Sequence, residues 1–254
     1  GHGDGATRFG FVHQALCYGS DAAFLDGTLD FVHDGLDAGD PVLAVVAPHN
    51  VRLLGEALGD HAQAVELIDA DEWYDQPPRT LGRYHAYCGD HGTGPAGRPR
   101  RVRVIGEPVW SGRTAFETGE WMRYESLVNV AFADSPHWIL CPYDTRALSD
   151  DLALAAARTH PVLGRASGTP AASVRYTDPG AFYAECARVV PRALPDGPDD
   201  VPFLRGGTAA VRRSAAAHDG HCRAQLLAGA EVVLEDRPHR GEARVAVPVH
   251  KVSI

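Results

Sequence analysis

The sequence lacks any run of apolar residues long enough to cross a membrane, since a spanning helix needs about 20 in succession. It also lacks an excess of positive charge, because 24 Lys and Arg residues stand against 33 Asp and Glu, for a formal net charge of −9. An acidic protein is not attracted to nucleic acid or to anionic membrane surfaces. We therefore expect a soluble protein with neither nucleic acid nor a membrane as its partner.

Paired cysteines are also missing. The five cysteines are an odd number, lie far apart in the sequence and form no CxxC motif. Widely spaced, unpaired thiols are typical of reduced intracellular proteins, whereas small secreted domains carry an even, dense set. We expect a cytoplasmic protein.

A phosphate-binding loop is a third absence, because no GxxxxGK[ST] motif occurs. The segment GTGPAG (92–97) matches GxGxxG, but a dinucleotide fingerprint needs a strand before it and a helix after it. Here the pattern predicts a helix before and a strand after. We interpret the segment as a turn, and the sequence identifies no cofactor.

What the sequence does contain is a regular alternation of short apolar runs with longer amphipathic segments. The predicted strands lie at 15–18, 41–48, 64–70, 101–110 and 137–144. The predicted helices lie at 20–39, 49–60, 79–91, 114–133 and 149–160. This alternation favours an α/β fold with a mainly parallel, doubly wound sheet flanked by helices.

The remainder of the chain differs in character. Residues 166–175 are polar and small and predict a linker. Residues 176–254 predict a small α+β region with a helix at 180–190, a longer helix over 208–236, broken near residues 219–220, and a last strand at 243–250.

Polar and aromatic residues gather where the predicted strands end, which is where parallel sheets bind ligands. Glu107 follows the fourth strand and Cys141 lies at the end of the fifth, so we expect them to share a cleft with His13 and Glu125. The predicted ligand-binding residues are His13, Glu107, Trp110, Trp121, Tyr124, Glu125, Cys141, Tyr143 and Asp144.

These residue types leave several chemistries open. A carboxylate, a thiol and an imidazole can bind a metal, activate a nucleophile or hydrogen-bond a polar ligand. Each residue also has an ordinary structural role, with Cys141 as a buried apolar side chain, Asp144 as a helix cap and Tyr124 as core. Because only one Cys and one or two His are at hand, we assign no metal to the site. Two other short patterns, His85-Cys88-His91 and HDGHC (218–222), are interpreted as incidental.

Several segments together resemble a known family. They are residues 11–46, VRVIGEPVW (102–110), YESLVNVAFAD (124–134), LCPYD (140–144) and RTHPVL (158–163). In this order and spacing they resemble the MEDS sensory domain, the DcmR-type domain of bacterial regulators, over residues 9–165. The resemblance implies a RecA-like α/β fold without a working P-loop and a role in sensing a small molecule. The family usually carries His before Glu on the fourth helix, where this sequence has Tyr124-Glu125.

The family domain is often followed by a GHKL-type ATPase of the anti-sigma-factor kind. Residues 208–236 are similar to the opening helices of that ATPase, including Glu231 at its N-box. The Asn that this box uses for Mg²⁺-ATP is replaced, because Val232 to Asp236 follow, and the glycine-rich lid boxes are missing. We interpret the region as a degenerate or truncated remnant and expect neither ATP binding nor kinase activity.

Three functions remain open from the sequence. The first is a cytoplasmic regulatory protein that binds a small-molecule ligand and contacts a regulatory protein partner. The second is an enzyme of small-molecule metabolism that uses Cys141, Glu107 and His13. The third is an inactive scaffold that acts through protein contacts. The resemblance favours the first, no catalytic residue is assigned, and a homo-oligomer stays open.

Overall fold

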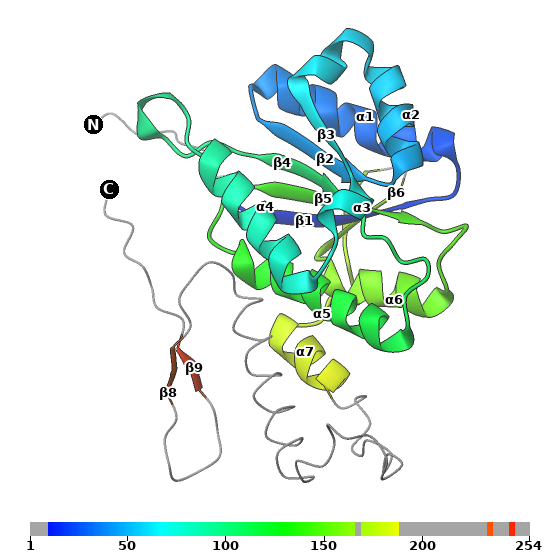
Figure 1. Cartoon of the computed structure of the whole chain (residues 1–254), viewed down its shortest axis with the longest axis vertical. Coiled ribbons are helices and arrows are strands. Elements are labelled where there is room, and N and C mark those ends of the chain that lie inside the picture. Colours follow the sequence, from blue (N-terminus) through cyan, green and yellow to red (C-terminus); the bar gives the residue numbers. More distant parts are fainter. Residues whose placement is uncertain (1–9, 166–168, 188–232, 236–243, 247–254) are drawn as a thin grey trace, which may run out of the picture.

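The chain forms an α/β domain, described here from a computed structural model that covers residues 10–165, 169–187, 233–235 and 244–246. A seven-stranded, mostly parallel sheet carries helices on both faces (Figure 1). The predicted fold class is confirmed. Within these residues, no helix has the length and apolar character that crossing a bilayer requires.

Strands and helices alternate along most of the chain. The strands of the sheet are β1 (Val12–Tyr18), β2 (Val42–Val46), β3 (Val65–Asp69), β4 (Arg103–Gly106), β5 (Trp138–Asp144), β6 (Val162–Arg165) and β7 (Ala171–Ala172). The helices are α1 (Asp21–Ala38), α2 (Pro48–Leu58), α3 (Ala70–Trp73), α4 (Pro77–His91), α5 (Ala115–Ala131), α6 (Asp150–Thr159) and α7 (Pro179–Ala187). Two short 3-10 turns, η1 (Gly59–Ala64) and η2 (Pro95–Gly97), join them.

The strand order is β3-β2-β4-β5-β1-β6-β7, and β7 is paired antiparallel to β6 whereas the other neighbours are parallel. Strand β1 lies inside the sheet, between β5 and β6. Its register sets His13 opposite Ile139 and Ala15 opposite Cys141. Residues of β1 and β5 that point to the same face therefore lie close together.

The two faces of the sheet have separate cores. Alternate residues of β1 belong to different cores, with Ala15 in one and Leu16 in the other, as the period of two in a strand requires. Helices α1 and α2 cover the face of Leu16, and α4, α5 and α6 cover the face of Ala15 (Figure 1). We call the second face the α5 face.

Helix α5 is buried on more than one side. All residues from Trp121 to Val128 are buried, because the sheet lies under the helix and α7 packs against it. On α7, the Pro179 carbonyl accepts a hydrogen bond from Ser126, and the Tyr183 ring faces the Arg123 guanidinium. A charged side chain on the sheet side of α5 therefore has no access to water.

The structure adds to the predicted elements and corrects two. The apolar run after His160 forms β6, which was not predicted. Residues 171–172, part of the predicted linker, form β7 on the sheet edge. Residues 233–235, predicted as helix, form β8 (Val233–Glu235) and pair antiparallel with β9 (Arg244–Ala246), where the β-branched Val233 and Val245 favour an extended backbone. The predicted strand over 101–110 is shorter, because β4 ends at Gly106. The rest of the proposed ATPase remnant lies outside the described residues.

Candidate functional site

Four side chains that can ligate a metal meet under α5 on the α5 face. They are His13 from β1, Glu125 from α5, Cys141 from β5 and His160 directly after α6. One ligating atom from each lies within 4.8 Å of the others, and all four residues are buried. We call this group the buried cluster.

The distances within the buried cluster are short. The Oε2 atom of Glu125 lies 3.6 Å from Nε2 of His13 and 3.4 Å from Nε2 of His160. The Sγ atom of Cys141 lies 3.5 Å from Nε2 of His13. The imidazole rings of His13 and His160 are 4.0 Å apart at their centroids. Polar atoms from β1, α5, β5 and the residue after α6 thus lie close together in the core.

Hydrogen bonds behind the rings define how both imidazoles are protonated. The amide nitrogen of Asn129 donates to the carbonyl of Thr159 (2.7 Å), which turns its Oδ1 toward Nδ1 of His13 (3.1 Å). Nδ1 of His160 lies 2.9 Å from the carbonyl of Ala156. An oxygen that only accepts needs a donor, so we infer that both rings carry their proton on Nδ1. With this tautomer, a neutral ring presents an Nε2 lone pair to the cluster.

With neutral rings, the cluster gathers a carboxylate and two lone pairs, and the Cys141 thiol is the one hydrogen-bond donor that its four members offer to one another. Burial lowers the pKa of His13 to about 4, with the neighbouring His160 acting in the same direction, so this ring is neutral at pH 7. Within the described part of the chain, neither oxygen of Glu125 nor Nε2 of His160 has a hydrogen-bond partner. Buried polar atoms without partners are rare and costly, so the site calls for a cation or a ligand.

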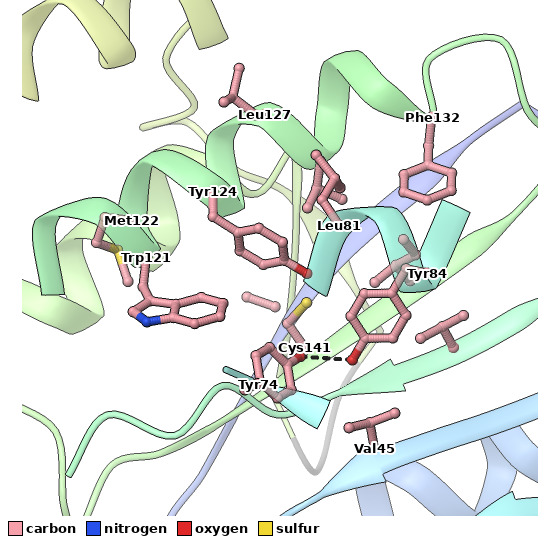
Figure 2. Packing of buried hydrophobic residues seen from close by; sticks show 14 of the residues in the cluster. Val45, Tyr74, Leu81, Tyr84, Trp121, Met122, Tyr124, Leu127, Phe132 and Cys141 are labelled. Carbon is pink, nitrogen blue, oxygen red and sulfur yellow. Dashed lines mark hydrogen bonds between the residues drawn. The ribbon is translucent and has the colours of Figure 1, made fainter. Parts of the chain in front are cut away.

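Aromatic side chains surround the buried cluster. The Tyr143 ring packs edge-on against His160 at 5.6 Å and lies parallel to Trp110 at 6.0 Å. On the other side, the hydroxyls of Tyr84 and Tyr74 are hydrogen-bonded to each other at 2.8 Å. Figure 2 shows the Tyr124 hydroxyl and the Cys141 thiol pointing toward one another. The cluster is thus enclosed by rings that carry polar groups.

Of the nine predicted site residues, the structure brings His13, Glu125 and Cys141 together, and Trp110 and Tyr143 lie beside them. Trp121 and Tyr124 belong to the same core, where the Trp121 ring contacts both Tyr124 and Tyr74. Glu107 and Asp144 make other contacts.

Glu107 does not join Cys141, so the predicted cleft that combined them is wrong. The preceding residue, Gly106, faces the Tyr74 and Tyr84 hydroxyls, and the next side chain points the opposite way. There Glu107 accepts hydrogen bonds from Tyr18 (2.5 Å), from the Asn50 amide (2.9 and 3.0 Å) and from the backbone of Ala47 (2.8 Å). Ala47 precedes the first turn of α2, where a carboxylate is favoured. The contacts give Glu107 a structural role that ties β4 to β1 and α2.

Asp144 lies at the end of β5 in an exposed charge group. It accepts hydrogen bonds from the backbone and guanidinium of Arg146, which also contacts Asp21. Burial would raise the pKa of Asp144, but the bonds from Arg146 lower it overall. These contacts form a turn after β5 and lie apart from the buried cluster.

Two residues of the site, His160 and Asn129, were not predicted from the sequence. His160 stands between a helix and the unpredicted β6, so its place next to β1 was not foreseen. The signal was the Pro161 that follows it and the short apolar run after that, which together mark a strand start. His85, Cys88 and His91 do not form a metal-ligand group among the described residues, and the HDGHC segment lies outside them.

Comparison with known proteins identifies a family for this chain. A family model described as MEDS, the MEthanogen/methylotroph, DcmR Sensory domain, matches residues 12–161. The matched span is more than half of the chain and includes all four residues of the buried cluster. No curated protein matches the chain.

Proposed function

The chain belongs to the MEDS family of sensory domains, and on that premise we propose that it is a cytoplasmic regulatory protein that binds a small molecule on the α5 face. Sensing is the role that the family description carries. The ligand, the place where it binds and the means by which the signal leaves the domain are the proposal.

One observation carries the proposed location. The hydroxyl of Tyr143 and the Nε1 atom of Trp110 are buried, and neither has a hydrogen-bond partner in the ranges that the structure describes. Each such group costs about 1–3 kcal/mol when left unpaired. Burial, and then the nearby Glu125, raise the pKa of Tyr143, so its hydroxyl keeps its proton and can donate. The indole nitrogen also donates.

Two adjacent donors favour a ligand with an acceptor oxygen. The Trp110 and Tyr143 rings lie nearly parallel, and Trp110 is partly exposed. Trp110 follows the carboxyl end of β4 and Tyr143 is the penultimate residue of β5, at the edge where parallel sheets bind ligands. A small molecule with a carbonyl, carboxylate or hydroxyl oxygen and an apolar body fits these contacts. We propose that the signal leaves the domain through contact with a protein partner.

A melting-temperature screen tests this proposal. Small oxygen-containing molecules are added to the full chain, and a ligand that binds the native state raises its melting temperature by mass action. We expect the shift to be lost in Trp110→Phe and Tyr143→Phe, which keep an aromatic ring at each position and remove the donors. Tyr176→Phe, a change at an exposed tyrosine, serves as the matched control. A screen without any shift, or equal shifts in all variants, would count against the proposal.

The enzyme alternative has less support. Cys141, His13 and Asn129 do lie in the order of a nucleophile, a base and an orienting amide, with contacts of 3.5 and 3.1 Å. However, burial and the nearby Glu125 raise the pKa of Cys141 well above its ordinary value, and His13 is a weak base. A reactive cysteine needs a lowered pKa and access to substrate. Cys141, at 4% exposure, offers neither.

A further inference from the structure

We propose that the buried cluster is a metal site in which His13, Glu125, Cys141 and His160 bind one Zn²⁺ ion. The inference goes beyond the small-molecule proposal and does not depend on it. The ion would lie under α5, whereas the small molecule would contact Trp110 and Tyr143.

Three of the distances between ligand atoms match the edges of a zinc tetrahedron. Zinc binds nitrogen and oxygen ligands at about 2.0–2.2 Å and thiolate sulfur at about 2.3 Å, so the edges of the tetrahedron measure about 3.3–3.8 Å. The measured edges are 3.6 Å from His13 to Glu125, 3.4 Å from His160 to Glu125 and 3.5 Å from Cys141 to His13. Three edges therefore already have the length that a central ion requires.

The charges also fit. Two neutral imidazoles, one carboxylate and one thiolate carry a charge of −2, which one divalent cation neutralises. Without an ion, the Glu125 carboxylate is buried and faces the Nε2 lone pairs of His13 and His160. Such an arrangement is costly in a site without water, because charge and lone pairs are left uncompensated. A cation at this point removes that cost.

The hydrogen bonds behind the ligands are those of a metal site. A metal-bound histidine donates its other ring N–H to a carbonyl, an amide or a carboxylate, which fixes the ring and the tautomer. Here His13 pairs with Asn129, and His160 pairs with the Ala156 carbonyl. In both rings the Nε2 atom is thereby directed to the cluster.

The ligand set selects the kind of metal. Thiolate with imidazole in tetrahedral geometry suits Zn²⁺, whereas Mg²⁺ and Ca²⁺ prefer oxygen ligands alone and Cu²⁺ prefers a flatter arrangement. Four protein ligands fill a tetrahedral zinc ion and leave no position for substrate. We infer a closed site that joins β1, α5, β5 and the residue directly after α6. Metal binding would therefore set how α5 lies on the sheet.

Metal titration of the full chain tests the inference. The protein is produced without a polyhistidine tag, stripped with a chelator and titrated with Zn²⁺ against a competing chelator. Co²⁺ is added in a parallel experiment, because a cobalt–thiolate bond gives a charge-transfer band in the near ultraviolet. We expect one equivalent of tightly bound Zn²⁺, a higher melting temperature and the cobalt–thiolate band.

Variants assign the site. Glu125→Gln and His160→Gln are expected to lose the tight equivalent, and Cys141→Ser is expected to lose the cobalt band. Cys17→Ser is the matched control, because Cys17 is a thiol on the same face of the neighbouring strand, opposite Tyr143. His61→Gln controls for exposed histidines. Both controls should bind as the parent does.

Clear outcomes would overturn the inference. They are a parent protein that takes up no stoichiometric Zn²⁺, a Co²⁺ spectrum without the thiolate band, or equal binding by parent and folded cluster variants. The cobalt spectrum of the parent needs no substitution, so the inference stays testable even where a cluster variant fails to fold. If a proton shared between Glu125 and an imidazole takes the place of the metal ion, the titration shows no uptake of Zn²⁺, and the inference is wrong.

Discussion

The Nε2 atom of His160 lies 3.4 Å from the Oε2 atom of Glu125, and both side chains are shielded from water. The other ring nitrogen of His160 is directed to the Ala156 carbonyl, so the contact joins a lone pair to a carboxylate. The Nε2 atom of His13 lies 3.6 Å from the same Oε2 atom of Glu125, so this oxygen faces the lone pairs of two imidazoles. A cation between the three side chains explains why they converge.

Asn129 should act as a positioning residue for the metal. Its Oδ1 accepts from His13 and its amide donates to the Thr159 carbonyl next to His160, so it holds both rings. We expect Asn129→Ala to weaken Zn²⁺ affinity by about 10–100-fold, the usual effect of removing a group behind a metal ligand. The cobalt–thiolate band should persist at saturating Co²⁺, because the four ligands remain. Competition titration measures the affinity, and an unchanged value would show that Asn129 has no such role.

Glu107 should matter for stability and not for binding. Glu107→Gln replaces an acceptor with a donor that faces the Asn50 amide and the Ala47 N–H. We expect the free energy of unfolding to fall by about 1–3 kcal/mol, the range for a buried hydrogen-bonding group left unsatisfied. Glu56→Gln, on the exposed side of α2, should change it by less than about 0.5 kcal/mol.

Urea unfolding at neutral pH measures both variants. Zn²⁺ uptake by Glu107→Gln should equal that of the parent, because Glu107 lies outside the buried cluster. A loss of metal binding with unchanged stability would contradict this assignment.

The Cys141 thiol should be protected from modification in the native protein. Burial raises the pKa of this thiol and closes off the reagent, and a bound metal would add further protection. We expect iodoacetamide to modify Cys17 and Cys186, which are partly exposed, before Cys141. Cys141 should react only after urea unfolds the chain. Peptide mapping by mass spectrometry locates the label. Rapid native labelling of Cys141 would contradict its protection and favour the enzyme alternative.

His137 should make the fold sensitive to acid. Burial, with His85 and Arg101 nearby, lowers its pKa from 6.5 to about 4, and its Nδ1 accepts from the Val102 N–H at 3.2 Å. The unfolded chain binds a proton at this residue at a higher pH than the native chain does. The stabilisation that neutral His137 gives to the native chain is therefore complete above pH 6.5 and is lost as the pH falls toward 4.

His137→Gln keeps an acceptor for Val102 and removes the titration. We expect the free energy of unfolding to fall less steeply between pH 6.5 and 4 in this variant than in the parent. His61→Gln, at an exposed position, is the control and should follow the parent. Parallel pH profiles for parent and His137→Gln would contradict the assignment.

Local patterns predicted most of the fold. The amphipathic spacing within residues 20–39 predicts α1, and in the structure the Ser20 side chain caps its first turn while Gly39, in the left-handed conformation, ends it. The continuous apolar run of β2 predicts a strand that is covered on both faces. The strand order was not predicted, because pairing depends on which distant segments pack together and no local pattern reports it.

The candidate site was predicted in part for the same reason. Cys141 and Glu125 stand in recognisable places at a strand and on a helix face, and both belong to the buried cluster. Glu107 was misplaced because the face that a residue takes after a strand ends is set by its new partners, here Tyr18 and Asn50. His160 was missed because its contact with His13 requires β6 to lie beside β1.

X-ray absorption spectroscopy of the Zn²⁺-loaded protein tests the central claim most directly. The metal site in the buried cluster predicts one sulfur neighbour at about 2.3 Å and three nitrogen or oxygen neighbours at about 2.0–2.2 Å. In Cys141→Ser the sulfur neighbour should disappear, and in Cys17→Ser it should remain. A zinc ion without a sulfur neighbour in the parent protein, or with more than one, would contradict the account.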